Sequence, residues 1–355
     1  MKWQGWTAVV AAGCAAACIG AAVLLPIPFV VWAPGTTADL LAAGEEPPVQ
    51  VAQGVNIYPT SGRLLLASLT QTGPDARVSL VEALYAYLVG SQEAVPRAAV
   101  YPSGADALEI AAAVATQTKT AQSNATAAAL RSAGIKVDPV PLVEAVNSGG
   151  PAAGKLEVGD IVLGIRYASA SAVTNVQTAA DAHAAVASGK VGDQVIFTVL
   201  RGDAKRDATV TTQGSKSNPD LPVAGVSFAQ GYRYDAQVVY KLDEGVGGND
   251  IGLMLALALY DKVTPDALLE NRVVAGTGSI DANGVVGRVS GVRERVVDAE
   301  RAGASVFLVP AANCAELADV HSTVRVVPVT TLAAAVDALG ALADPTTQKT
   351  VKGCS

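Results

Sequence analysis

The chain has 355 residues, of which half are hydrophobic and only 16% are charged. Disordered proteins combine low hydrophobicity with high net charge, so this composition excludes that class. The net charge of −7, without a basic cluster, argues against a nucleic-acid partner. Two histidines and four scattered cysteines offer few ligands for a zinc site. We therefore predict no metal and no other cofactor.

The N-terminal segment is apolar and uncharged. No charged side chain occurs from Trp6 to Trp32, and Pro26 and Pro28 are expected to end a helix over residues 6–25. About 20 apolar residues are enough for a helix to cross a bilayer, so we predict a transmembrane anchor. A cleaved signal peptide, including one of the lipoprotein type, and a buried core helix are the alternatives.

Charge on either side of this segment predicts its orientation. Lys2 precedes it, whereas Asp39 and Glu45 follow it, which favours a cytoplasmic N-terminus and a main body outside the cell membrane. That compartment permits disulfides. Cys314 and Cys354 are the only cysteines beyond the apolar segment, so we predict a bridge between them. Two unrelated buried thiols are the alternative.

The rest of the chain has the mixed pattern of an α+β protein. Alternation around a Ser-Gly pair predicts a hairpin over 55–73, and helical spacing predicts a helix over 79–90. Composition favours helices over 105–118 and 124–134.

A distinct set of spaced motifs follows. The sequence GGPAAGKLEVGDIVLGI is followed by a short helix at 180–188 and the strand QVIFTVLRG. Over residues 130–213 this pattern resembles a PDZ domain of the bacterial, protease-associated kind. The resemblance implies that a peptide adds as a strand and that backbone N–H groups cap its carboxylate. A spacer or an inhibitory lid is the alternative role.

The resemblance also implies where the carboxylate-binding loop lies. We expect it at Gly134, Ile135, Lys136 and Val137. These residues depart from the usual Gly-Leu-Gly-Phe pattern, so capture of free C-termini stays open.

One apparent nucleotide motif is rejected. Gly149, Gly154 and Lys155 have the spacing of a P-loop, but Leu156 stands where Ser or Thr must hold magnesium. We predict no ATP binding.

Residues 232–330 carry a second set of motifs: GVGGNDIGLMLALALYDK, GTGSIDANGVVGRVSGVRERV and FLVP. They resemble the proteolytic domain of Lon-type serine proteases, in particular membrane-anchored bacterial proteins that also carry a PDZ module. The upstream SGRLLLASLTQTG and SLVEALYAYLVG resemble the opening of the same domain. This implies a discontinuous Lon-like domain with an inserted PDZ domain. Lon-type domains form hexameric rings, so homo-oligomers or hetero-oligomers with an active relative are implied as well.

Lon-type proteases use a Ser–Lys dyad, and the resemblance implies where its two residues would stand. Gly-Pro-Ser-Ala-Gly aligns without a gap with residues 248–252, which places Asp250 at the serine position. Gly-Gly-x-x-x-Lys aligns with 290–295, which places Arg295 at the lysine position, and Thr277 matches the threonine that supports the lysine. Serine needs a neighbouring base, and arginine, with a pKa above about 12, cannot be one. We predict an Asp250–Arg295 ion pair and no Ser–Lys hydrolysis.

Other residues could rescue catalysis only from positions outside the dyad. The nearest hydroxyls and amines in sequence are those of Ser279, Ser290, Lys241 and Lys262. A pair of carboxylates, Asp250 with Asp243 or Glu244, is the other possibility. His183 and His321 are interpreted as surface or packing residues.

These observations predict a single-pass α+β membrane protein. The expected parts are an anchor with its cytoplasmic tip (1–34), a linker (35–49), the first part of the Lon-like domain (50–129), the PDZ domain (130–213), the main Lon-like part (220–340) and a tail (341–355). The favoured function is a pseudoprotease that binds polypeptides outside the cytoplasm, as adaptor, chaperone or regulator. An active ATP-independent serine endopeptidase and a purely structural envelope protein are the alternatives.

Overall fold

The computed structural model describes residues 2–89, 91–202, 204–243 and 245–354. It has the mixed α+β class that the sequence predicts. The chain divides into two compact units, one built from residues 1–134 with 236–355 and the other from residues 135–235.

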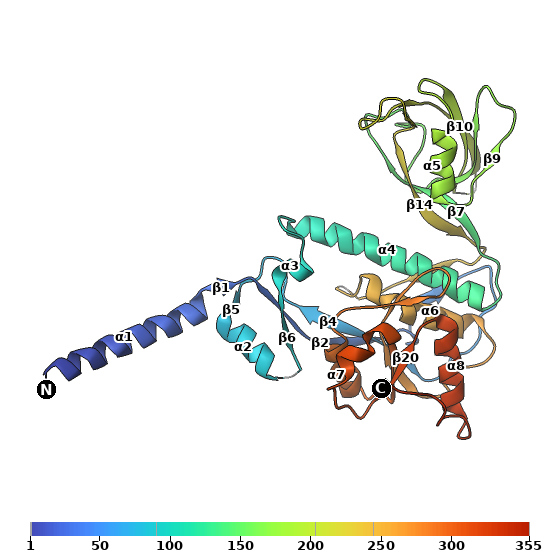
Figure 1. Ribbon diagram of the computed structural model, residues 1–355. Helices are drawn as coiled ribbons and strands as arrows, with labels where there is room; N and C mark the ends of the chain where they lie inside the picture. The colour runs from blue at the N-terminus through green and yellow to red at the C-terminus, as the bar shows by residue number, and fades with distance from the viewer. Residues whose placement is uncertain (1, 90, 203, 244, 355) are drawn as a thin grey trace. The chain divides into compact units, whose positions relative to one another are not determined.

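A six-stranded sheet forms the centre of the first unit, in the order β20–β19–β16–β4–β2–β6. Its strands are β2 (Phe29–Asp39), β4 (Arg63–Gln71), β6 (Glu93–Pro96), β16 (Val273–Gly276), β19 (Val306–Pro310) and β20 (Arg325–Val329). The pairs β4–β16, β16–β19 and β19–β20 are parallel, whereas β2 pairs antiparallel with β4 and β6. Figure 1 shows this sheet in the lower part of the view.

Helices cover both faces of the sheet. The helices of this unit are α1 (Lys2–Leu24), α2 (Leu80–Val89), α3 (Arg97–Val100), α4 (Ala107–Ser132), α6 (Gly252–Val263), α7 (Val292–Arg301) and α8 (Leu332–Ala343), with 3-10 turns η1 (Asn249–Ile251) and η2 (Ala311–Leu317). On one face, Val292 and Val296 of α7 share a core with Leu65 of β4 and Phe307 of β19. Strand alternation turns Leu64 to the other face, where α6 contacts β4 and α4 lies along α6 (Figure 1).

Three small strand pairs complete the unit. They are β1 (Pro26–Ile27) with β5 (Val78–Ser79), β3 (Val49–Val51) with β15 (Val238–Tyr240), and β17 (Ser279–Ile280) with β18 (Val286–Gly287). The last pair is a hairpin whose connection contains Asn283 and Gly284.

Two predictions before residue 135 need correction. The hairpin expected over 55–73 is wrong: β4 is one long strand whose partners are β2 and β16. The two helices expected over 105–118 and 124–134 are a single helix, α4. Alanine and other good helix formers continue across 119–123, so no breaker separates them.

The apolar N-terminal segment forms α1, which ends at Leu24, one residue before the predicted end. Within the part of the chain that the structure describes, no helix combines the length and the apolar character needed to cross a membrane. The predicted transmembrane span therefore has no support from the structure.

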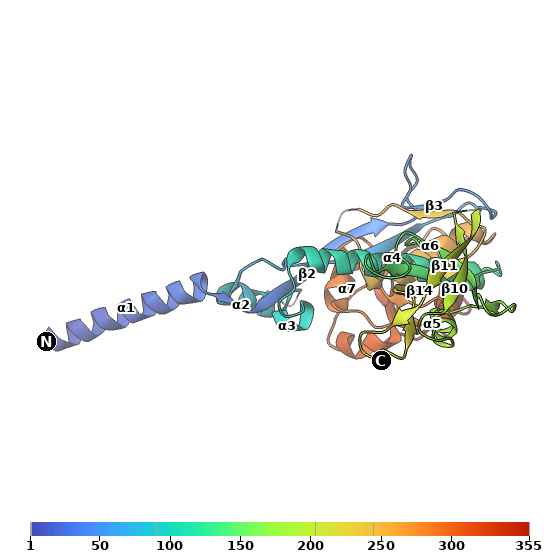
Figure 2. The same ribbon diagram turned by 90° about the horizontal axis from the view of Figure 1, so that it is seen from above.

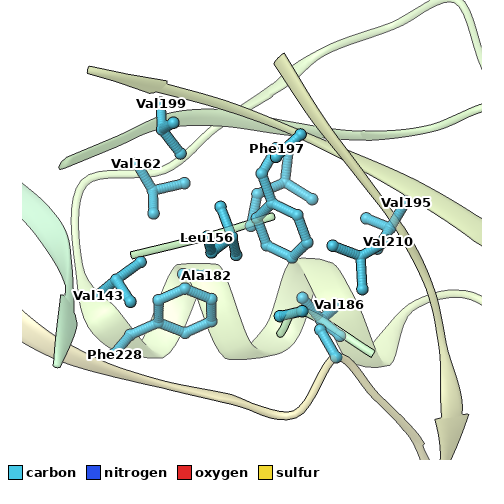
Figure 3. Packing of buried hydrophobic residues seen from close by; sticks show 14 of the residues in the cluster. Val143, Leu156, Val162, Ala182, Val186, Val195, Phe197, Val199, Val210 and Phe228 are labelled. Atoms are coloured by element: carbon cyan, nitrogen blue, oxygen red, sulfur yellow. The ribbon is translucent and has the colours of Figure 1, made fainter. Parts of the chain in front are cut away.

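The second unit is a curved sheet with one helix. Its elements are β7 (Asp138–Val146), β8 (Ile161–Tyr167), β9 (Thr174–Asn175), α5 (Ala179–Ala187), β10 (Gln194–Arg201), β11 (Ala204–Thr211), β12 (Gln213–Gly214), β13 (Pro222–Val223) and β14 (Val226–Arg233). The main sheet has the order β11–β10–β8–β7–β14. Figure 3 shows its core, where Phe197 and Phe228 face Ala182 and Val186 of α5. Residues 151–155, which begin at the proline of the Gly-Gly-Pro sequence, form a series of turns.

The C-terminal tail is tied to the first unit. The predicted Cys314–Cys354 disulfide is present, with its Cα atoms 5.2 Å apart. Arg325 adds two hydrogen bonds, to the carbonyl oxygens of Gln348 at 2.7 Å and Val351 at 2.6 Å. The bridge closes a 40-residue loop, which disfavours the unfolded chain.

Candidate functional site

A glycine-rich loop positions Asp250 at the start of α6. Gly248 has φ +98°, a conformation that glycine adopts without strain, and its N–H donates to Thr118 Oγ1 at 2.8 Å. A Cβ on Gly247 would lie 2.6 Å from the same oxygen, so the loop can approach α4 only without a side chain there. Asp250 follows on the 3-10 turn η1, directly before α6.

Arg295 lies in the first turns of α7 and is buried. Its Nη2 donates to Asp250 Oδ2 in a single short ion-pair contact. Nη1 donates to the carbonyl oxygen of Ala67 at 2.5 Å, and Nε donates to that of Ser290 at 3.3 Å. The structure therefore brings together the two residues that the sequence analysis aligns with the dyad, and all three guanidinium nitrogens have partners.

Thr277 supports the other member of the pair. The resemblance implied that this threonine supports residue 295, but its Oγ1 donates to the backbone carbonyl oxygen of Asp250 at 3.0 Å. The N–H of Gly278 donates to the same oxygen at 2.9 Å. Thr277 is fully buried, so its hydroxyl is used locally to fix the turn that carries Asp250.

A cavity of about 1160 Å³ adjoins the ion pair. Asp250 and Arg295 line it together with Tyr101 and with residues of β2, β4, α4 and the glycine-rich loop, including Trp32, Ser68–Gln71, Glu109, Gln117 and Gly245–Asn249. Both polar and apolar side chains line it. A cavity of this size whose lining includes an ion pair is the default candidate for a binding site.

One edge of β4 borders this cavity without a strand partner. β16 pairs only with Arg63–Leu66, while Leu69, Thr70 and Gln71 line the cavity. The N–H of Arg63 donates toward the β16 side, to Arg272, so alternation directs the backbone groups of Leu69 and Gln71 to that same side. Arg295 already donates to the carbonyl oxygen of Ala67, and among the described residues no strand pairs with Leu69 or Gln71 on this side.

Two acidic side chains of α7 are buried beside this site. Glu294 and Asp298 each have one carboxylate oxygen that is buried without a hydrogen-bond partner among the described residues. Burial raises the pKa of Glu294, and the Glu93 carboxylate raises it further, while Arg293 and Arg295 lower it in part. Burial likewise raises the pKa of Asp298.

The raised pKa predicts the direction in which Glu294→Gln changes the stability of the fold. Folded protein holds this proton more tightly than unfolded chain, so wild-type stability falls as pH rises from about 4.5 through the raised pKa. We expect the substitution to stabilise the fold by about 1 kcal/mol at pH 8 and to lose this advantage near pH 4. Urea unfolding at several pH values measures it.

Glu300 on the same helix provides a control of opposite sign. Hydrogen bonds from Thr323 and Ser322 lower its pKa, so Glu300→Gln should destabilise the protein at pH 8. An advantage of Glu294→Gln that does not change with pH would contradict the burial argument.

The second unit presents a free sheet edge at β14. Val143 bonds through its N–H and C=O to Asp160 and Gly159 on the side away from β14. Phe228 pairs with Val143, so its own N–H and C=O point away from β7. The same alternation places the backbone groups of Gln230 on the outer edge.

Helix α5 lies beside this edge, and we call the two together the β14–α5 edge (Val226–Arg233 with Ala179–Ala187). The ring of His183 packs edge-on against Phe228, with centroids 5.0 Å apart. The amide of Gln230 donates to the carbonyl oxygen of Gln177, just before α5, at 3.3 Å. His183 is exposed and serves as a packing residue, as the sequence analysis interpreted it.

Residues 134–137, where the sequence analysis expects the carboxylate-binding loop, lie at the opposite end of β14 from its first residue. Gly134 to Val137 follow α4 and precede Asp138, which pairs with Arg233 at the last position of β14. Lys136 makes an ion pair with Asp138 at 3.1 Å. The first position of β14 instead follows Gly225, and Gly225-Val226-Ser227-Phe228 is closer to the Gly-Leu-Gly-Phe pattern than residues 134–137 are. That signal was present in the sequence but lies after the segment assigned to the module.

Comparisons with known proteins identify two domain families in the chain. Residues 123–212 match the family model of the PDZ domain, and residues 245–340 match that of the Lon protease (S16) C-terminal proteolytic domain. In the comparison with curated proteins, nothing matches.

Similar solved structures cover the PDZ part. The PDZ domain of an SdrC-like protein from Listeria innocua is 25% identical over 26% of this chain and 93% of that one, with a TM-score of 0.22. Its counterpart from Listeria monocytogenes is 24% identical over 25% and 85%, with a TM-score of 0.21. A Geobacillus thermodenitrificans protein is 26% identical over 24% and 92%, with a TM-score of 0.21. By the two family matches, the chain combines a PDZ domain with a proteolytic domain of the Lon protease (S16) type.

Proposed function

We propose that this protein is a pseudoprotease: it binds polypeptides but does not hydrolyse them. The observation that carries the proposal is the ion pair between Asp250 and Arg295 at the two dyad positions. Peptide hydrolysis by a dyad needs a nucleophile and a base that can take its proton. Arg295 stays protonated and donates to three oxygen atoms, so it cannot accept that proton.

The alternative, an active endopeptidase, would need another base and nucleophile at the cavity. Among the described residues that line it, there is no lysine and no histidine, and the carboxylates are Asp250 and Glu109. Ser68 lines the cavity, but its Oγ donates to the carbonyl oxygen of Thr36 and accepts from that residue's N–H. No base stands beside this hydroxyl, which supports the pseudoprotease.

The other proposed rescuers are also engaged or distant from the cavity lining. Lys241 forms an ion pair with Glu46 at 2.7 Å, and Lys262 is beside the buried Asp261 at the end of α6. Ser290 lines the cavity, where its carbonyl oxygen accepts from Arg295. Ser279, Asp243 and His321 do not line it, and Glu244 lies outside the described residues.

The ligand that fits the cavity best is an extended polypeptide. The free edge of β4 offers backbone groups at Leu69 and Gln71, and a strand added there would pass Asp250. Main-chain hydrogen bonds give such binding its affinity with little dependence on sequence. The test is saturable binding of fluorescein-labelled unfolded casein by the purified chain, followed by mass analysis of the casein. We expect intact casein after binding; a purely structural protein would show no binding.

The PDZ domain implies peptide binding, and we place that binding at the β14–α5 edge. Gln230→Pro removes an outward N–H but leaves the bonds to β7, since proline is tolerated on edge strands. Gln230→Ala is the matched control, because it loses the same side chain and keeps the N–H. We expect peptide affinity, measured by fluorescence anisotropy, to fall at least about tenfold for the proline variant relative to the alanine variant. Equal affinity in both variants would place the site elsewhere.

We also propose an extracytoplasmic location at the cell membrane. Its support is the uncharged run from Trp6 to Trp32 and the disulfide, since structural disulfides are typical of exported proteins. Alkaline extraction of cell membranes tests it: we expect the chain to stay in the pellet, and release into the supernatant would contradict a membrane-held chain. Assembly into a ring, alone or with an active relative, stays a prediction of the resemblance.

A further inference from the structure

The helix α2 buries its small apolar side chains and exposes its large ones, which is the reverse of the usual distribution. Its small residues face the protein: Ala83 is 8% exposed and Ala86 is fully buried. Its large ones face outward, with exposures from 48% for Val81 to 79% for Tyr87. The outward set is Leu80, Val81, Leu84, Tyr85, Tyr87 and Leu88, which we call the α2 face.

A surface helix normally buries its large apolar residues and exposes its polar ones. The one charged residue of α2, Glu82, caps the helix, where its carboxylate accepts from the N–H of Ser79 at 2.7 Å. Contiguous exposed apolar patches of this kind mark an interaction surface.

The angular width of the α2 face favours a partner with a broad, deformable surface. At 100° per residue, its six side chains cover an arc of about 160° around the helix. A helix that lies in a membrane interface buries its apolar face at the boundary between headgroups and acyl chains. The two tyrosines combine an apolar ring with a hydroxyl, as side chains at the level of lipid headgroups do.

The face is also continuous with the apolar N-terminal segment. β1 follows α1 directly and pairs with β5, with Pro26 opposite Ser79, and α2 begins at the next residue, Leu80. Figures 1 and 2 both show α2 next to the end of α1. Val23, Leu24 and Leu25 extend the exposed apolar surface up to this point.

We propose that the α2 face lies in the interface of a lipid bilayer and holds the first unit against the membrane. The flanking charges, Asp75, Arg77, Glu93 and Arg97, sum to zero, so the contact is apolar and does not depend on anionic lipid. The inference rests on the proposed membrane location but goes beyond it. An anchor at α1 alone would leave α2 in water.

The test uses the full chain with Cys14→Ser and Cys18→Ser, so that a single introduced cysteine carries a bimane label. Labels at Tyr87→Cys and, independently, Leu84→Cys report on the face. Val285→Cys is the control, because Val285 is a single exposed valine on the β17–β18 hairpin connection. The chain is bound to phosphatidylcholine vesicles that contain doxyl-phosphatidylcholine, and quenching is compared.

We expect at least twofold more quenching at positions 87 and 84 than at 285. Co-sedimentation with the vesicles reports separately on membrane location. Sedimentation with equal quenching at all three positions would overturn the inference and leave the location intact. Failure to sediment would overturn both. Crosslinking between two copies at position 87 without extra quenching would assign the face to a second copy, which also overturns the proposal.

Discussion

The double substitution Asp250→Ser with Arg295→Lys is expected to create a serine that reacts with fluorophosphonate probes. Thr277 and the N–H of Gly278 would still fix the turn that carries residue 250. A lysine at 295 would be buried near the N-terminus of α7, and both burial and the helix dipole favour its neutral form. A neutral amine can take the serine proton, which contributes about 10²- to 10⁴-fold to rate.

The single variants are the matched controls for this restoration. Asp250→Ser alone has the hydroxyl beside a permanent cation, and Arg295→Lys alone has the amine beside a carboxylate. We expect labelling of the double variant to be at least about 100-fold faster than that of either single variant or of wild type. Equal labelling of the double variant and the Asp250→Ser variant would show that position 295 does not face the nucleophile.

Replacing one partner of the ion pair is expected to lower the free energy of unfolding more than replacing both partners together. Asp250→Ala leaves the buried Arg295 without its counter-ion, which we expect to lower the free energy of unfolding by about 2–3 kcal/mol. This is less than the usual cost for fully buried pairs because the Asp250 side chain is 24% exposed. Arg295→Met leaves Asp250 partly hydrated but deprives the carbonyl of Ala67 of its donor. Because both single variants lose the same interaction, their costs overlap.

The measurement is a double-mutant cycle by urea unfolding with Asp250→Ala, Arg295→Met and both together. We expect a coupling free energy above about 1 kcal/mol. The exposed pair of Lys241 and Glu46 is the control in the same unit, where the coupling should stay below about 0.5 kcal/mol. Additive costs at positions 250 and 295 would contradict the ion pair as the organising contact of the site.

The contact between Asp250 and Arg295 was predictable because the Lon-type resemblance places both residues at the dyad positions. A glycine-rich turn leads Asp250 into α6, and Gly291 starts α7 at the turn before Arg295. These local motifs fix the turn on which each residue lies, whereas the resemblance alone indicated that the two turns meet. The partner of Thr277 was not predictable, because a hydroxyl that can reach two residues is decided by tertiary packing.

Long-range strand pairing explains what the sequence analysis missed. β4 looked like one arm of a hairpin, but it pairs with β16, whose first residue, Val273, is opposite Arg63. Alternation along a strand does not say which distant strand will be its neighbour. β14 is a similar case: it closes the PDZ-like sheet from beyond the segment that carried the recognisable motifs. The sequence analysis therefore expected the carboxylate-binding loop directly before β7, whereas the free edge of the sheet is the neighbouring strand, β14.

The most direct test of the pseudoprotease is the rate of peptide-bond hydrolysis by the purified wild-type chain. Unfolded casein and a mixed peptide library are incubated with wild type and with Asp250→Ala, and new termini are counted by mass spectrometry. The ion-pair account predicts that neither sample forms new termini faster than buffer does. Cleavage by wild type that Asp250→Ala abolishes would contradict it.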